Sequence, residues 1–188
     1  MTQAELLQYL VDVLERLSID YMIVGSHASI YYGEPRFTQD VDVVVELRRS
    51  QLPGFLESFP LAEFYVSEEA ARDALARRGQ FNIIHGASGV KIDVFIGKDT
   101  DYDHVRFARR QQLPLIPGRT AFFARPEDVI LYKLLYFRDG GSDRHLRDVA
   151  GILAVSGSSI DIEYAAEWAS RLGVTELWDG VRRRVEGH

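Results

Sequence analysis

Two aspartates one residue apart, Asp40 and Asp42, stand among valines in the stretch 40-DVDVVV-45. Side chains alternate along a β-strand, so both carboxylates face one way while Val41, Val43 and Val45 face a core. Two like charges about 7 Å apart on one strand repel each other. A divalent cation such as Mg²⁺ or Mn²⁺ removes this repulsion, because it prefers oxygen ligands and binds carboxylates together with phosphate oxygens. The spacing indicates a metal–phosphate site; the alternative is a strand with one solvated face.

A third carboxylate, Asp93, lies in the middle of another apolar strand, 90-VKIDVFI-96. If that strand pairs beside the first, Asp93 joins Asp40 and Asp42, and three acids on neighbouring strands can hold two metal ions. A single acid in a strand is otherwise an exposed one. Two roles are open for Asp93: completing a second metal site, or activating the hydroxyl of an acceptor.

Gly25 and Ser26 separate a short apolar strand from a short helix. Glycine permits close approach of the backbone to a ligand, and the amides and hydroxyl at a helix start can hold a phosphate. A Gly-Ser turn is also common for purely structural reasons, so its functional weight depends on the acids that follow it.

The elements that must hold these residues follow from apolar periodicity and from turn residues. A mixed α/β segment of residues 1–125 precedes a helical segment of residues 126–188, and we expect both to form a single structural unit. The predicted helices are 2–17, 27–32, 50–59, 67–78, 126–137, 143–153, 161–172 and 175–185, and the predicted strands are 21–24, 41–45, 81–84, 90–96 and 121–123.

The composition is that of an ordinary globular protein, with 46% hydrophobic and 27% charged residues among 188. The net charge of -6 disfavours general nucleic-acid binding, although a local basic patch can still hold RNA. The chain contains no cysteine, which excludes thiolate chemistry and suits the cytoplasm. We find no signal peptide and no apolar run of the roughly 18 residues that a membrane span needs.

Lys133 is the lone charge inside the apolar run 129–137 of the predicted helix 126–137, which should be buried because it is apolar nearly all round. A buried lysine needs an anionic partner; the alternative is that its stem carries the ammonium to solvent. Asp148, on the next helix, either neutralises Lys133 or Arg147, or holds a nucleobase or an attacking hydroxyl.

The ordered combination of these motifs resembles a known signature. Gly25-Ser26, thirteen intervening residues, Asp40-Val41-Asp42-Val43 and later Ile92-Asp93-Val94 resemble the nucleotidyltransferase superfamily of DNA polymerase beta. The resemblance implies an α/β (α+β) nucleotidyltransferase fold, in which a small mixed sheet is flanked by helices and followed by a C-terminal helical region. It also implies dependence on Mg²⁺ or Mn²⁺ and an NTP as substrate.

The segments 36-RFTQD-40 and Glu127–Leu153 resemble the AbiEii-type branch of this superfamily, which includes toxins of type IV toxin–antitoxin systems. The chain is short for a toxin of this branch, and the branch does not uniformly use the third strand acid. The resemblance implies phosphate binding by Ser26 and Thr38, triphosphate binding by Lys133, metal binding by Asp40 and Asp42, and a second active-site acid in Asp148. We also expect Gly25 and Arg36 to bind phosphate and Asp93 to bind metal.

The expected activity is transfer of a nucleoside monophosphate from an NTP to an acceptor. RNA, with tRNA favoured by the resemblance, a protein and a small molecule all stay open as acceptors. Two alternatives keep the fold and change the role: an antitoxin-like enzyme that attaches AMP to a partner protein, and a nucleotide- or partner-binding module without turnover. The sequence does not define the oligomeric state.

Overall fold

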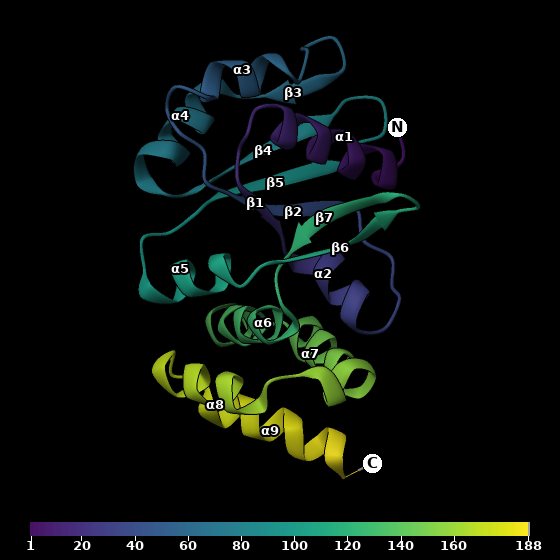
Figure 1. The fold of residues 1–188 in the computed structure, drawn as a ribbon, viewed down its shortest axis with the longest axis vertical. Helices are drawn as coiled ribbons and strands as arrows, with labels where there is room; N and C mark the ends of the chain where they lie inside the picture. Colours follow the sequence, from purple (N-terminus) through teal and green to yellow (C-terminus); the bar gives the residue numbers. More distant parts are fainter. Residues whose placement is uncertain (188) are drawn as a thin grey trace. The chain divides into compact units, whose positions relative to one another are not determined.

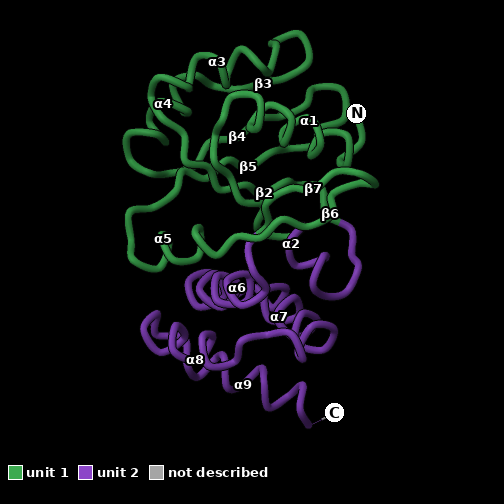
Figure 2. Tube along the Cα trace, in the orientation of Figure 1, with its two compact units in different colours: residues 1–26, 38–123 green, residues 27–37, 124–188 purple. Residues whose placement is uncertain are grey.

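The computed structural model describes residues 1–187, which fall into two compact units (Figure 2). The sheet unit consists of Met1–Ser26 and Thr38–Phe123, and the helical unit consists of His27–Phe37 and the chain from Ala124 onward. The predicted division into residues 1–125 and 126–188 stays a prediction, because independent folding of either part is what would define a domain.

The sheet unit is built on one mixed sheet of seven strands in the order β3-β4-β5-β2-β1-β7-β6 (Figure 1). Strand β2 lies at its centre, antiparallel to β1 and parallel to β5. The hairpin of β4 and β5 and the hairpin of β6 and β7 flank this centre. The strands are β1 (Tyr21–Ile23), β2 (Asp40–Val45), β3 (Phe64–Val66), β4 (Gln80–His85), β5 (Lys91–Ile96), β6 (Gln111–Ile116) and β7 (Arg119–Phe123).

The valines of β2 explain its central place, because β-branched side chains pack well on a pleated, buried surface. Val41, Val43 and Val45 are completely buried, and so are Ile92 and Val94 on neighbouring β5. The strand therefore anchors the sheet through one face while its aspartates occupy the other.

Four helices belong to the sheet unit, and a fifth, α2 (Gly25–Tyr32), begins in it and continues into the helical unit. Thr2 and Glu5 form a capping box at the start of α1. Helix α1 packs on β2, and α4 packs on β4 and β5. The four helices are α1 (Gln3–Arg16), α3 (Leu52–Glu57), α4 (Glu68–Arg77) and α5 (Asp101–Ala108).

The helical unit contains α6 (Pro126–Gly140), α7 (Asp143–Ser156), α8 (Ile162–Arg171) and α9 (Thr175–Glu186). Helix α6 packs against α7 and α8, while α9 packs against α7 and α8. The predicted burial of α6 is confirmed, since Ile130, Leu131 and Leu134 have no solvent exposure. No helix within residues 1–187 has both the length and the apolar character needed to cross a membrane.

The predicted small mixed sheet flanked by helices, with a helical C-terminal region, is confirmed. Three elements were missed: β3, α5 and most of the hairpin of β6 and β7. Strand β3 has only three residues, which is too short for a period-2 pattern. Pro114 disfavours a strand at this position, but β6 is an edge strand, where a residue without an N–H is tolerated.

Candidate functional site

The register of β2 and β5 sets the arrangement of the acidic residues. The two strands are parallel, and Asp42 lies opposite Asp93 while Asp40 lies opposite Lys91. Side chains two residues apart share a face, so these four side chains occupy the corners of one patch on the sheet. The Asp40 side chain is 49% exposed and that of Asp93 is 12% exposed. Asp40 is thus the acid that is open to solvent.

Lys91 brings a positive charge into this patch. Its Nζ lies 2.8 Å from Oδ2 of Asp93 and 3.9 Å from Oδ1 of Asp40. The hydrogen bond to Asp93 raises the pKa of Lys91, and the charges of Asp93, Asp40 and Asp42 raise it further against the opposing effect of burial. The sequence analysis missed this residue, although the same alternation that groups the aspartates places Lys91, two residues before Asp93, on their face.

Asp93 has a second partner on its other side. Asn82 of β4 lies opposite Asp93, and its side-chain amide, in the orientation that satisfies its neighbours, donates to Oδ1 of Asp93 over 2.6 Å. One carboxylate oxygen of Asp93 is therefore bound by Lys91 and the other by Asn82. Asp93 is thus hydrogen-bonded by one residue of its own strand and by one residue of the neighbouring strand β4.

Asp42 packs against the turn that opens α2. Its Oδ2 accepts a hydrogen bond from the backbone N–H of Ser26 over 3.2 Å. Gly25 has a φ of +59°, and a Cβ at this position would lie 2.0 Å from the same Oδ2. Glycine is required here for two reasons, the positive φ and the closeness of the carboxylate. The Gly25-Ser26 turn, which the sequence predicts to hold a phosphate, thus also holds Asp42 in place.

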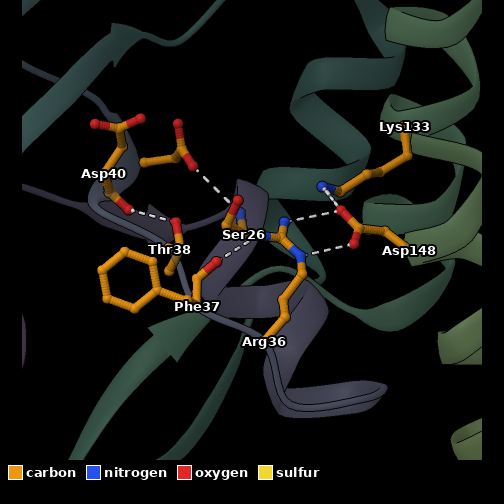
Figure 3. Close-up of polar contacts among 8 residues, drawn as sticks. Ser26, Arg36, Phe37, Thr38, Asp40, Lys133 and Asp148 are labelled. Atoms are coloured by element: carbon orange, nitrogen blue, oxygen red, sulfur yellow. Dashed lines mark hydrogen bonds and ion pairs between the residues drawn. The ribbon is translucent and has the colours of Figure 1, made fainter. Parts of the chain in front are cut away.

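Thr38 and Gln3 support the first residue of β2. The Thr38 hydroxyl lies 3.4 Å from the backbone carbonyl of Asp40 and donates to it (Figure 3), and the side-chain amide of Gln3 donates to the same carbonyl over 3.3 Å. Thr38 is buried. Its hydroxyl is thereby directed at the backbone that carries the first acid.

We expect Gly25→Ala to lower the free energy of unfolding by more than Gly89→Ala does, as measured by urea denaturation. Gly89 has a φ of +68° but nothing within 4 Å of its would-be Cβ, so Gly89→Ala reports backbone strain alone, about 1 to 2 kcal/mol. Gly25→Ala adds the clash with Asp42. Equal costs for the two variants would show that the Asp42 carboxylate moves freely and that the turn does not hold it.

The helical unit contains its own charged cluster, formed by Arg36, Lys133 and Asp148. Arg36 binds Asp148 through two parallel hydrogen bonds, from Nε to Oδ1 over 2.8 Å and from a terminal nitrogen to Oδ2 over 3.0 Å (Figure 3). Lys133 donates to Oδ2 of Asp148 from a neighbouring helix. The Lys133 and Asp148 side chains are each 7% exposed. The expected anionic partner of Lys133 is therefore Asp148, which also binds Arg36.

Asp148 is held in its charged form. Burial alone would raise the pKa of Asp148, but the hydrogen bonds and charges of Arg36 and Lys133 together outweigh burial and lower that pKa below its ordinary value. Nearby His145 has a lowered pKa because of its own burial and the charge of Lys133. The cluster thus places two cations around one carboxylate that stays ionised.

We expect Asp148→Asn to lower the free energy of unfolding by about 2 to 4 kcal/mol at neutral pH, because it removes the negative charge beside Lys133, which is buried, and Arg36, which is partly buried. A carboxyl with a lowered folded-state pKa stabilises the fold above the unfolded pKa of about 3.9, and the effect is lost as pH falls through the folded value. The difference between wild type and variant in urea denaturation should therefore shrink below about pH 4.

The matched control is Asp139→Asn. Asp139 is paired with Arg138 on the surface of the same unit, with a side-chain exposure of 65%, and exposed ion pairs contribute at most about 1 kcal/mol. A stability difference between wild type and Asp148→Asn that stays constant down to about pH 2.5 would contradict the assigned role of Asp148.

The nine predicted site residues fall into two groups. Gly25, Ser26, Thr38, Asp40, Asp42 and Asp93 lie together in the sheet unit, and Arg36, Lys133 and Asp148 lie together in the helical unit. Their roles in binding and catalysis stay predictions. Lys91 and Asn82 are the residues near the acids that the sequence analysis did not single out.

The chemistry of the acidic patch fits one divalent cation. Within residues 1–187, no three histidine, aspartate or glutamate side chains gather so that they could hold a metal ion. Asp40 and Asp42 offer carboxylate oxygens on one face, which is the ligand type that Mg²⁺ prefers. Asp93 differs from them because Lys91 and Asn82 bind its oxygens.

Solved structures with the same architecture include a nucleotidyltransferase-like protein and an antibiotic adenylyltransferase. An antigenic nucleotidyltransferase-like protein from Paracoccidioides brasiliensis is 21% identical over 80% of this chain and 74% of its own, with a TM-score of 0.57. The antibiotic-resistance factor ANT(2'')-Ia is 17% identical over 95% and 97% of the two chains, with a TM-score of 0.62. The lincomycin-bound lincosamide antibiotic adenylyltransferase LnuA is 11% identical over 82% and 98%, with a TM-score of 0.56.

At these identities the likeness establishes the fold, and the expected nucleotidyltransferase fold is confirmed. No protein-family model matches the chain, and no curated protein does.

Proposed function

We propose that the protein is a nucleotidyltransferase that moves a nucleoside monophosphate from an NTP to an acceptor. The observation that carries this proposal is the register that sets Asp42 opposite Asp93, with Asp40 on the same face, in a sheet of the nucleotidyltransferase fold. An acceptor oxygen attacks the α-phosphorus, the bond from that phosphorus to the oxygen that leads to the β-phosphate breaks, and pyrophosphate leaves. The acceptor hydroxyl loses its proton in the same reaction.

Asp40 and Asp42 are the residues that would hold a divalent cation. When bound, Mg²⁺ or Mn²⁺ neutralises phosphate charge and orients the reacting oxygens. The Asp40 side chain is 49% exposed, and Asp42 is fixed against the Gly25-Ser26 turn. A fixed carboxylate beside an open one suits a site that must accept and release a charged substrate.

Gly25, Ser26 and Thr38 are proposed to position the phosphates. The backbone at Gly25 approaches Asp42 so closely that no side chain fits between them. The start of α2 presents backbone N–H groups, which favour phosphate oxygens. In this proposal the Gly25-Ser26 turn fixes the Asp42 carboxylate and also binds the triphosphate.

Arg36 and Lys133 are proposed to bind the triphosphate. Both are fixed by Asp148, so their side chains are ordered before substrate arrives. Two cations around one carboxylate retain a net positive charge, which suits a polyphosphate. The lowered pKa of Asp148 keeps it ionised, which favours a role in positioning these cations over a role as proton acceptor.

The acceptor and the donor nucleotide are matters for experiment. Two similar structures are named for adenylyl transfer or its product, LnuA and ANT(2'')-Ia in complex with adenylyl-2''-tobramycin, which makes ATP the first donor to test. The motif resemblance to the AbiEii-type branch supports tRNA as acceptor and a place in a toxin–antitoxin system. Attachment of AMP to a partner protein, and nucleotide binding without turnover, are the competing outcomes.

Incubation with each α-labelled NTP, Mg²⁺ and a cell lysate tests the proposal. We expect label to enter RNA, protein or a small solute, and the labelled class identifies the acceptor. Calorimetry with the same NTP and Mg²⁺ separates binding from turnover. Heat of binding without label transfer would favour the non-catalytic module. The absence of both heat of binding and label transfer would refute the proposed function.

The double variant Asp40→Ala, Asp42→Ala should lose label transfer by roughly a hundredfold or more, since charge neutralisation and positioning dominate this chemistry. Its fold should persist, because removing two repelling charges costs little stability. Circular dichroism checks the fold, and Asp73→Ala, which changes an exposed acid of α4, is the matched control. Full transfer by the folded double variant would refute the mechanism.

A further inference from the structure

Lys91 is the one residue of the acidic patch whose charge is opposite to that of its neighbours. It donates a hydrogen bond to Asp93 over 2.8 Å and lies 3.9 Å from Asp40, so its ammonium group stands between acids of two strands. The parallel register puts Lys91 opposite Asp40. This placement follows from the backbone pairing, because a lysine opposite one acid and two residues before another must share their face.

The oxygens of Asp93 are already engaged. Oδ2 binds the Lys91 ammonium and Oδ1 accepts from the Asn82 amide. The Asp93 side chain is 12% exposed, compared with 49% for Asp40. A metal ion at Asp93 would have to displace a charged hydrogen bond, and such bonds are stronger than neutral ones.

We propose that the Lys91 ammonium takes the place of a second divalent cation, so that the acidic patch binds one metal ion per chain, at Asp40 and Asp42. The inference rests on the proposed function, which assigns those two acids to a metal. Lys91 and Asn82 are positioning residues in this scheme: they fix Asp93, and Asp93 in turn fixes the ammonium beside Asp40.

Charge balance supports a single ion. Three carboxylates and one ammonium leave two net negative charges on the patch, which one divalent cation neutralises. A second divalent ion would leave the patch positive and would lie beside the Lys91 ammonium. Like charges at such distances repel strongly near a partly buried surface.

Counting bound Mn²⁺ tests the inference without any assay of activity. Free aquated Mn²⁺ gives an electron paramagnetic resonance signal that falls when the ion binds, so a titration yields the number of ions per chain. We expect one Mn²⁺ in wild type and two in Lys91→Met, which frees Asp93. Lys98→Met, which removes an exposed lysine just beyond β5, should still bind one.

Lys91→Gln is a second variant in case Lys91→Met folds poorly. It keeps a polar side chain beside Asp93 and should also bind two ions. Thermal melting with and without Mn²⁺ accompanies each titration. If Lys91 were merely structural, both variants would melt earlier and would still bind one ion.

Two bound Mn²⁺ ions in wild type would overturn the inference whatever the variants do. No bound ion in wild type would also overturn it, and so would a single bound ion in folded Lys91→Met. The double variant Asp40→Ala, Asp42→Ala separates this inference from the proposed function. One ion in wild type, lost in the double variant, together with no label transfer from any NTP would refute the reaction and leave the Lys91 inference standing. Label transfer together with two bound ions in wild type would support the proposed reaction and overturn the Lys91 inference.

Discussion

Repulsion between carboxylates on one face of the central sheet is the constraint on which the rest of the sheet unit depends. Strand β2 must be buried on its valine face to hold the sheet together, and alternation then forces Asp40 and Asp42 onto the other. Groups next to the carboxylates offset this repulsion. A backbone N–H faces Asp42, and an ammonium faces Asp93 and Asp40.

The helical unit solves the opposite problem. Lys133 is buried in an apolar helix and needs a negative partner, and Asp148 supplies it while also binding Arg36. The two charged clusters thus differ in the sign of their net charge: three acids accompany one lysine in the acidic patch, and two cations surround one acid in the cluster of Arg36, Lys133 and Asp148.

Much of this could be predicted from the sequence, because the decisive patterns are short and local. Alternation in 40-DVDVVV-45 placed the acids, and the lone lysine of an apolar helix predicted an acidic partner. Pairings between distant segments could not be derived: nothing local connects Arg36 with Asp148, 112 residues later, or sets Asn82 beside Asp93. The place of Lys91 could also have been predicted, because alternation along the strand puts Lys91 on the same face as Asp93.

The short segment His27–Phe37 has a consequence for the order in which the protein assembles. During synthesis it leaves the ribosome long before its partners: Tyr32 hydrogen-bonds the carbonyl of Ala124, and its own carbonyl accepts from Ser156. Gly33 lies against the backbone of α7 so closely that a Cβ there would meet the Ile152 nitrogen at 3.0 Å. Residues 27–37 therefore lack their packing partners until the last third of the chain has been synthesised. The cluster of Arg36, Lys133 and Asp148 is accordingly among the last features to form.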